Sequence, residues 1–203
     1  MRQAYEAGRW AFVTDYVRLK ALTEMGGVYM DTDVEVVKKL DPFLKHQAFV
    51  GFEHISRVQT GLMACEKNFP LFLDFLHHYD AASFVKEDGS VDVTTNVEVL
   101  TDLCLERGLV LNDKFQVVDG LAVYPREVFC PVDYDTKKLK KTRKTVVIHW
   151  FSGSWHTEEE LQWEREEKLR LKREKRSNIR YAIGNKLFGE GGYEKLKSIL
   201  KRK

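Results

Sequence analysis

The feature that most constrains the fold is a helical pattern that passes directly into a strand pattern. Apolar side chains recur at helical spacing over residues 10–25, and Gly26 with Gly27 supplies the backbone freedom that commonly ends a helix. Short apolar runs follow at once, at 28–30 and 34–37. Helices that alternate with short strands predict an α/β fold.

The rest of the chain alternates in the same way. Residues 69–79 have a helical pattern with Pro70 in the first turn, and another helical pattern starts near Thr95 and runs to 106. Strand patterns lie at 48–53, 58–65, 116–119, 121–125 and 146–151. Residues 158–180 are mostly charged with sparse leucines, which predicts an exposed helix.

Composition excludes several classes of protein. A chain of 203 residues that is 43% hydrophobic, with a net charge of +2, fits a folded domain without a nucleic-acid partner. Cys65, Cys104 and Cys130 form no CxxC pair, so we expect core thiols without a disulfide framework or zinc site. No apolar run reaches the roughly eighteen residues of a membrane span, and no signal-peptide pattern is present. We therefore expect a cytoplasmic protein.

Asp31 and Asp33 follow the strand pattern at 28–30 and place two carboxylates one residue apart. Side chains at positions i and i+2 of a strand share a face, so a strand would direct both carboxylates to one point. Such a pair is stable when solvated at a turn, or when a cation lies between the two groups. Oxygen ligands of this kind suit Mg²⁺ or Mn²⁺, and both explanations remain open.

Two further segments place polar groups where apolar ones are expected. Asp15 and Arg18 lie three residues apart on one face of an otherwise apolar helix, as either a surface ion pair or part of a cleft. The segment 148-IHWFSGSWH-156 follows a β-branched strand. Its His149 is either a further metal ligand or an ordinary hydrogen-bonding residue, and its Ser152 and Ser154 hydroxyls could face phosphate oxygens.

Together these segments resemble glycosyltransferase family 32, the glycosyltransferase sugar-binding region containing DXD motif. Bacterial capsular and lipopolysaccharide sugar transferases belong to that family. The shared pattern is an Asp three residues before an Arg, followed by a GG-[IV]-Y-x-D-x-D block. Here that pattern comprises Asp15, Arg18, Gly26, Gly27, Tyr29, Asp31 and Asp33. The resemblance continues through 48-AFVGFE-53, 89-GSVDVTTN-96 and 148-IHWFSGSW-155.

The resemblance implies a GT-A fold, with a mixed central sheet flanked by helices, over residues 1–156. It also implies retaining transfer of a hexose from a nucleotide-diphosphate donor, a UDP-sugar, held through Mn²⁺ or Mg²⁺. The acceptor would be a saccharide or a lipid-linked saccharide. The charge pattern, and not the resemblance, predicts that residues 157–203 form a charged helical C-terminal extension.

Site roles carry over position by position. Asp33 would bind the metal directly, Asp31 would bind donor hydroxyls and reach the metal through water, and His149 would be a late metal ligand. The remaining donor-binding residues implied by the resemblance are Asp15, Arg18, Tyr29, Ser154 and Trp155. Asn96 and Glu98 are candidates for the acceptor side. No protein nucleophile is evident, which favours same-face attack assisted by the leaving phosphate.

The sequence departs from the family pattern at its start. Family members have strands and helices before the DXD block that help to hold the nucleotide base, and Asp31 lies too near Met1 for these. We therefore expect an N-terminally truncated domain that lacks about sixty residues. Such a domain would have an exposed sheet edge and would bind its donor weakly.

The tail and the function each leave alternatives. Residues 193–203 predict a basic amphipathic helix, which either contacts the anionic inner face of the membrane peripherally or packs on the domain. A non-catalytic remnant, or a fragment that depends on a partner, is one competing function. A metal-dependent phosphoryl-transfer enzyme is another, although it would need more carboxylates around two metals.

Overall fold

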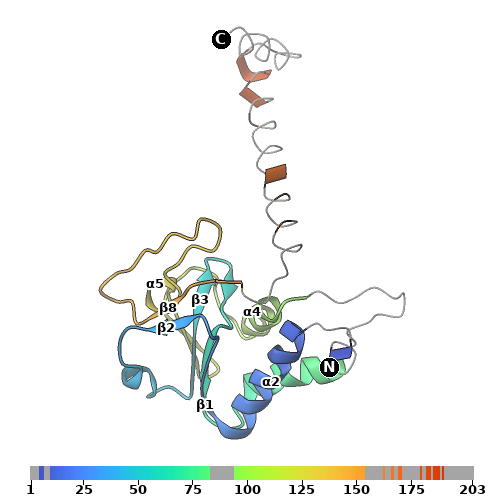
Figure 1. Ribbon diagram of the computed structural model, residues 1–203, viewed down its shortest axis with the longest axis vertical. Helices are drawn as coiled ribbons and strands as arrows, with labels where there is room; N and C mark the ends of the chain where they lie inside the picture. Colours follow the sequence, from blue (N-terminus) through green and yellow to red (C-terminus); the bar gives the residue numbers. More distant parts are fainter. Residues whose placement is uncertain are drawn as a thin grey trace. The chain divides into compact units, whose positions relative to one another are not determined.

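The computed structural model describes residues 5–6, 10–82 and 94–153, together with isolated positions between 162 and 189. The chain divides into two compact units, Met1–Ser152 and Gly153–Lys203. Every described strand belongs to the first unit (Figure 1). None of the described helices is both long and apolar enough to cross a membrane.

A mixed sheet forms the centre of the first unit. Its strand order is β1 (Gly27–Met30), β5 (Leu62–Cys65), β3 (Ala48–His54), β7 (Leu121–Tyr124) and β6 (Gln116–Val118), with β4 (Arg57–Val58) paired to β3. β3 and β7 are parallel, and the other pairs are antiparallel. The predicted α/β class with a mixed central sheet is confirmed. β1 is an edge strand of this sheet.

Both faces of the sheet are covered. The helices are α2 (Trp10–Met25), α3 (Pro70–Ala81), α4 (Asn96–Glu106) and the short α5 (Arg126–Phe129). Val50 and Phe52 of β3 lie in a core shared with α2, α3 and α4, whereas Phe49 packs with Phe129 of α5 on the opposite face. A strand buried on both faces has a continuous apolar run, which explains the composition of β3.

A second, two-stranded sheet places the segment after Asp33 beside the last described strand. β2 (Val34–Val36) pairs antiparallel with β8 (Val147–His149), and Val34 is opposite His149. Figure 1 shows β2 and β8 together, on the side of the central sheet away from α2. A 3₁₀ turn, η1 (Asp41–Phe43), follows β2.

The predicted glycine turn between helix and strand is confirmed. α2 ends at Met25, and Gly26 has a φ of +70° while its N–H donates to the Leu22 carbonyl at 2.8 Å. A Cβ at Gly26 would lie 2.8 Å from the backbone nitrogen of Lys67. Position 26 therefore requires glycine for both its backbone conformation and its packing.

One predicted strand is wrong. The run 58–65 forms two strands, β4 and β5, and Gln59–Gly61 lies between them. The Gln59 N–H donates to the Gly51 carbonyl at 2.9 Å, and the Gly61 carbonyl accepts from Asp31 at 2.9 Å. These contacts hold residues 59–61 between Gly51 of β3 and Asp31, which follows β1. An apolar run in the sequence does not reveal that tertiary contacts interrupt the strand here.

Only part of the C-terminal unit is described. Five described positions of the predicted 158–180 helix are helical and exposed: Gln162, Glu166, Leu169, Arg170 and Ile179. The amide of Gln162 donates to Glu166 at 3.2 Å, as expected four residues apart on a helix. The basic segment 193–203 lies outside the described residues.

The predicted start of α4 is confirmed at Thr95, which forms a capping box. Its hydroxyl accepts from the Glu98 N–H at 3.3 Å, and its own N–H donates to the Glu98 carboxylate at 3.0 Å. We expect Thr95→Ala to lower the free energy of unfolding by about 1 kcal/mol in urea titration. Thr95→Ser, which keeps the acceptor, should lose much less, and equal losses would contradict the capping role.

Candidate functional site

Three potential metal ligands converge from two distant segments. Oδ2 of Asp31, Oδ1 of Asp33 and Nε2 of His149 belong to a cluster whose ligand atoms all lie within 4.8 Å of one another. Nε2 of His149 is 3.3 Å from Asp33 and 3.9 Å from Asp31. The pairing of β2 with β8 brings the histidine to the two aspartates.

The two carboxylates converge for a different reason from the predicted one. β1 ends at Met30, and Asp31 to Asp33 form a turn that enters β2, so strand alternation does not apply. The Val34 N–H closes this turn on the Asp31 carbonyl at 3.1 Å. The turn therefore directs both carboxylates toward His149.

Asp33 is held as a carboxylate by the segment after β8. The backbone N–H and the hydroxyl of Ser152 both donate to its Oδ2, at 2.8 and 2.9 Å. Burial raises the pKa of Asp33, but these two hydrogen bonds, together with the charge of His149 and a backbone hydrogen bond, outweigh it and leave the pKa below its usual value. The Ser152 hydroxyl thus donates to Asp33, whereas the sequence leaves it as a group that could face phosphate oxygens. Oδ1 of Asp33 remains directed at His149.

His149 is buried, and burial lowers its pKa despite the opposing effect of Asp33. The neutral imidazole is the form that binds metal ions. Its ring stacks on Phe151, with centroids 4.1 Å apart. A Cβ at Gly61 would lie 2.7 Å from Cε1 of His149, so the absence of a side chain at position 61 makes room for the ring. No local pattern in the sequence marks this role of Gly61.

A buried guanidinium links helix α2 to the DXD turn. Arg18 lies 3.0 Å from Oδ1 of Asp15 and 3.2 Å from Oδ1 of Asp31, and it also donates to the Thr60 carbonyl at 3.2 Å. Its guanidinium lies over the Tyr29 ring, 4.6 Å from the centroid. Of the two explanations left open by the sequence, the surface ion pair is wrong, because Asp15 and Arg18 are both buried.

Asp15 also anchors α4. Oδ1 of Asp15 accepts from the Asn96 amide at 2.6 Å, across 81 positions of the sequence. Burial raises the pKa of Asp15 to about 6, although Arg18 and the Asn96 hydrogen bond both lower it. Asn96, a predicted acceptor-side residue, therefore lies against a predicted donor-binding residue.

Tyr29 lies on the same side of β1 as this network. Its hydroxyl donates to Oδ1 of Asp31 at 2.6 Å, the oxygen that also faces Arg18. Burial raises the pKa of Tyr29, so the phenol keeps its proton and acts as a donor. Oδ2 of Asp31 is left to face His149.

The other predicted site residues lie elsewhere. Glu98 caps α4 and lies 3.8 Å from Arg57, so its observed contacts are structural. Ser154 and Trp155, predicted to contact the diphosphate, are outside the described residues. Trp150, between β8 and Phe151, donates its indole N–H to Glu35 at 3.0 Å.

Glu53 is a further acidic group near the cluster. It lies where the pairing of β3 with β4 shifts register, between Phe52 and His54. Burial raises its pKa to about 7 against the effect of Arg57, and the charge of Asp31 raises it further. Register shifts are common beside active sites because they redirect a side chain.

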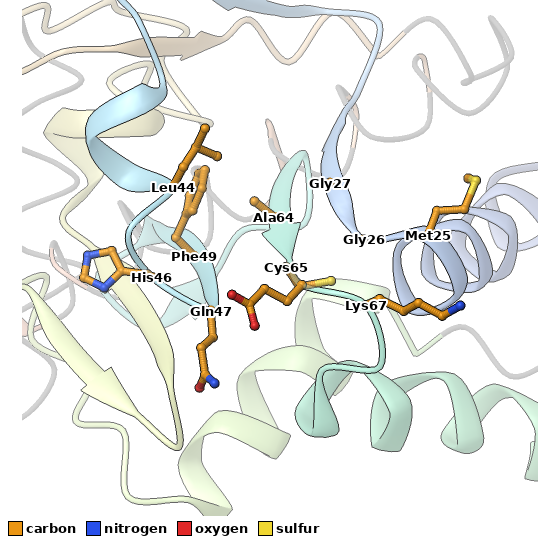
Figure 2. Close-up of a pocket in the computed structure, with 11 residues that line it drawn as sticks. Met25, Gly26, Gly27, Leu44, His46, Gln47, Phe49, Ala64, Cys65 and Lys67 are labelled. Carbon is orange, nitrogen blue, oxygen red and sulfur yellow. The ribbon is translucent and has the colours of Figure 1, made fainter.

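A separate hollow lies at the opposite end of β1. Its volume is about 320 Å³, and Figure 2 shows Leu44, His46 and Phe49 on one side with Met25 and Lys67 on the other. Gly26 and Gly27, which precede the strand, form part of its lining. The DXD turn follows the other end of the same strand, so this hollow contains none of the metal-ligand candidates.

The donor set of the cluster fits a hard divalent cation. Two carboxylates and one neutral imidazole supply three ligands, leaving positions for oxygen atoms of a bound anion. Two buried nitrogens at the site, Nε of Arg18 and Nδ1 of His149, make no hydrogen bond within the described part of the chain. Most buried polar atoms in native proteins are hydrogen-bonded, so these two nitrogens need an explanation, and a bound ligand would supply one.

The packing of Gly61 against His149 gives a direct test of the cluster. Gly61→Ala should displace the imidazole and also crowd Oδ2 of Asp31, which lies 3.1 Å from the added Cβ, so it should weaken Mn²⁺ binding, measured by calorimetry, at least as much as His149→Ala does. The double variant should then bind no more weakly than Gly61→Ala alone. Additive losses would show that Gly61 acts independently of His149.

Burial of Asp15 predicts a pH-dependent cost in stability. Its pKa of about 6 lies above the value of 3.8 in an unfolded chain, so the folded state binds the proton more tightly. Relative to Asp15→Asn, the wild-type chain should lose on the order of 2–3 kcal/mol as the pH rises from 4 to 7. Denaturant titrations at several pH values measure this difference, and a constant difference would contradict the raised pKa.

The first part of the chain is similar to a known family. Residues 1–50 match the family model described as glycosyltransferase sugar-binding region containing DXD motif. No curated protein and no solved structure matches the chain. The matched span supplies Asp15, Arg18, Asp31 and Asp33, and the fold adds His149 from outside it. The match supports a glycosyltransferase that uses a nucleotide-sugar donor.

Proposed function

We propose that this chain is a metal-dependent glycosyltransferase that moves a hexose from a UDP-sugar to a saccharide or lipid-linked saccharide. We place it with the family 32 enzymes of bacterial capsule or lipopolysaccharide synthesis, at the cytoplasmic face of the membrane. The observation that carries the proposal is the convergence of Asp31, Asp33 and His149 beside the buried Arg18 network.

The charge of the cluster suits a diphosphate bound through Mn²⁺ or Mg²⁺. Asp33 and His149 would bind the metal ion directly, and Ser152 keeps the Asp33 carboxylate ionised and oriented. A bound divalent cation would neutralise charge on the diphosphate as the glycosidic bond breaks. Oδ2 of Asp31 faces the same position, so Asp31 is either a second ligand or a contact through water.

The Arg18 network would hold the sugar of the donor. Asp15 and Asp31 fix the guanidinium from two sides, and Asn96 and Tyr29 fix those two carboxylates. Side chains held by several partners lose little entropy when a ligand binds, which favours orientation of the sugar hydroxyls. The acceptor would attack on the same face of the sugar that the diphosphate leaves, so the product would keep the anomeric configuration of the donor.

A phosphoryl-transfer enzyme has less support. Two-metal chemistry of that kind needs more carboxylates than a single site provides. Within the described residues, Asp31, Asp33 and His149 form one three-ligand cluster, and no second cluster of three such residues accompanies it. Hydrolysis of phosphodiesters without any use of nucleotide sugars would favour this alternative.

Thermal unfolding tests the proposed donor site. UDP with Mn²⁺, at about one hundred times the dissociation constant, should raise the Tm of the wild-type chain by about 5–10 °C. Asp33→Asn should remove this increase because it removes the direct ligand. The control, Asp102→Asn, makes the same substitution at an exposed carboxylate on α4, and this variant should show the full increase in Tm.

The outcomes separate the alternatives. A Tm increase that Asp33→Asn abolishes would lead to a panel of UDP-sugars and to the anomeric configuration of the product. A folded wild-type chain without any increase would refute a working donor site and favour the non-catalytic alternative. An increase that survives Asp33→Asn would contradict the metal role of the DXD turn.

A further inference from the structure

The segment between α5 and β8 carries an unusual concentration of positive charge. In residues 134–144, here called the basic loop, six of eleven side chains are Lys or Arg and one is acidic, Asp135. All eleven residues are exposed. In Figure 1 the loop (yellow to orange) lies outside the pair of strands β2 and β8. Neither the proposed metal site nor the core of the domain accounts for this charge.

The basic loop has a defined conformation. Val132 and Leu139 form an isolated antiparallel bridge, and the Lys140 N–H donates to the Pro131 carbonyl at 2.9 Å. Oδ1 of Asp133 accepts from both the N–H and the hydroxyl of Thr136, at 2.9 and 2.7 Å. A loop whose backbone is already ordered loses less backbone entropy on binding than an unstructured segment does.

Most of this charge is not neutralised within the described structure. Lys144 pairs with Glu127 at 2.7 Å, whereas the side chains of Lys138, Lys140, Lys141 and Arg143 form no ion pair with a described residue.

Two neighbouring cations extend the patch. Lys38 and Lys39 follow β2 and are exposed. The Lys38 ammonium donates to the Arg143 carbonyl, and its N–H donates to the Val146 carbonyl at 3.2 Å. The basic loop and these two lysines therefore form one cationic surface.

Exposed apolar groups are set among these charges. Leu139, with 40% of its surface exposed, lies between the pairs Lys137–Lys138 and Lys140–Lys141. Tyr134 is 42% exposed, and its ring lies against the Lys137 ammonium, 4.5 Å from the centroid. Soluble polyanions offer no partner for an exposed leucine. An anionic bilayer accepts both features, because lysines reach its phosphates while leucine and tyrosine enter the interface.

We propose that the basic loop, with Lys38 and Lys39, docks this protein on the surface of an anionic phospholipid bilayer. The surface lies next to the candidate site, because Lys137 donates to the Phe151 carbonyl at 3.1 Å and Phe151 stacks on His149. A docked loop would hold the site near the headgroups, where a lipid-linked acceptor would be located; this last point rests on the proposed function. The docking itself does not depend on metal or donor.

Binding of the full chain to vesicles tests the proposal. Vesicles of phosphatidylcholine with about 30% phosphatidylglycerol, an anionic lipid, should bind the full chain without metal or UDP, because polybasic segments are attracted to anionic lipid. Pure phosphatidylcholine vesicles should not, and binding should fall steeply as salt rises. Lys138→Glu/Lys140→Glu/Lys141→Glu should lower the partition coefficient by roughly 100-fold or more. The matched control, Lys45→Glu/Lys67→Glu/Lys114→Glu, makes the same change in net charge on exposed residues outside the patch and should lose far less.

Two further variants distinguish binding to a bilayer from binding to a soluble polyanion, and membrane docking from donor binding. Leu139→Ser leaves the charge unchanged and should weaken vesicle binding several-fold while leaving retention on heparin, a soluble polyanion, unaltered. Asp33→Asn should bind vesicles as the wild type does, whatever its effect on donor binding. Vesicle binding that survives reversal of the three loop lysines would overturn the proposal. Loss of binding to heparin and vesicles alike in the triple variant, with no effect of Leu139→Ser, would overturn it in favour of a soluble polyanion.

Discussion

The buried guanidinium of Arg18 is the interaction on which the rest of the site depends. A buried charge is costly unless its hydrogen-bonding groups meet partners, and this one meets Asp15, Asp31 and the Thr60 carbonyl. Those partners belong to α2, to the turn after β1, and to the segment between β4 and β5. The two terminal nitrogens of Arg18 make these contacts, and pairing them fixes the position of three segments, of which the DXD turn is one.

The electrostatic balance of the site follows from that arrangement. Arg18 compensates one negative charge among Asp15, Asp31 and Asp33, and burial favours neutral His149. A deficit of positive charge remains beside Asp33 and His149, where Ser152 keeps the Asp33 carboxylate ionised. A divalent cation has the charge that this position lacks, and its remaining coordination sites suit diphosphate oxygens. The glycosyltransferase similarity and the geometry thus support the same chemistry.

The basic loop lies beside this acidic site and carries the opposite charge. The contact of Lys137 with Phe151, and of Phe151 with His149, joins the two regions through a short series of packed groups. The cationic surface and the acidic site are therefore adjacent, and each attracts ions of the opposite charge. Both regions lie in the part of the chain that also holds the central sheet.

The sequence by itself determined the features that depend on near neighbours along the chain. The spacing of Asp15 and Arg18 on α2, the glycine turn at Gly26 and the start of α4 at Thr95 follow from helical periodicity, backbone freedom and capping. The three cysteines were predicted to be core residues, and all are buried.

Only the tertiary structure decided the features that join distant segments. Asn96 binds Asp15 across 81 positions, and Ser152 binds Asp33 across 119. The division of the apolar run at Gln59–Gly61 and the space that Gly61 leaves for His149 also depend on packing. Local patterns do not specify such contacts, because their energies are realised only when the whole sheet has formed.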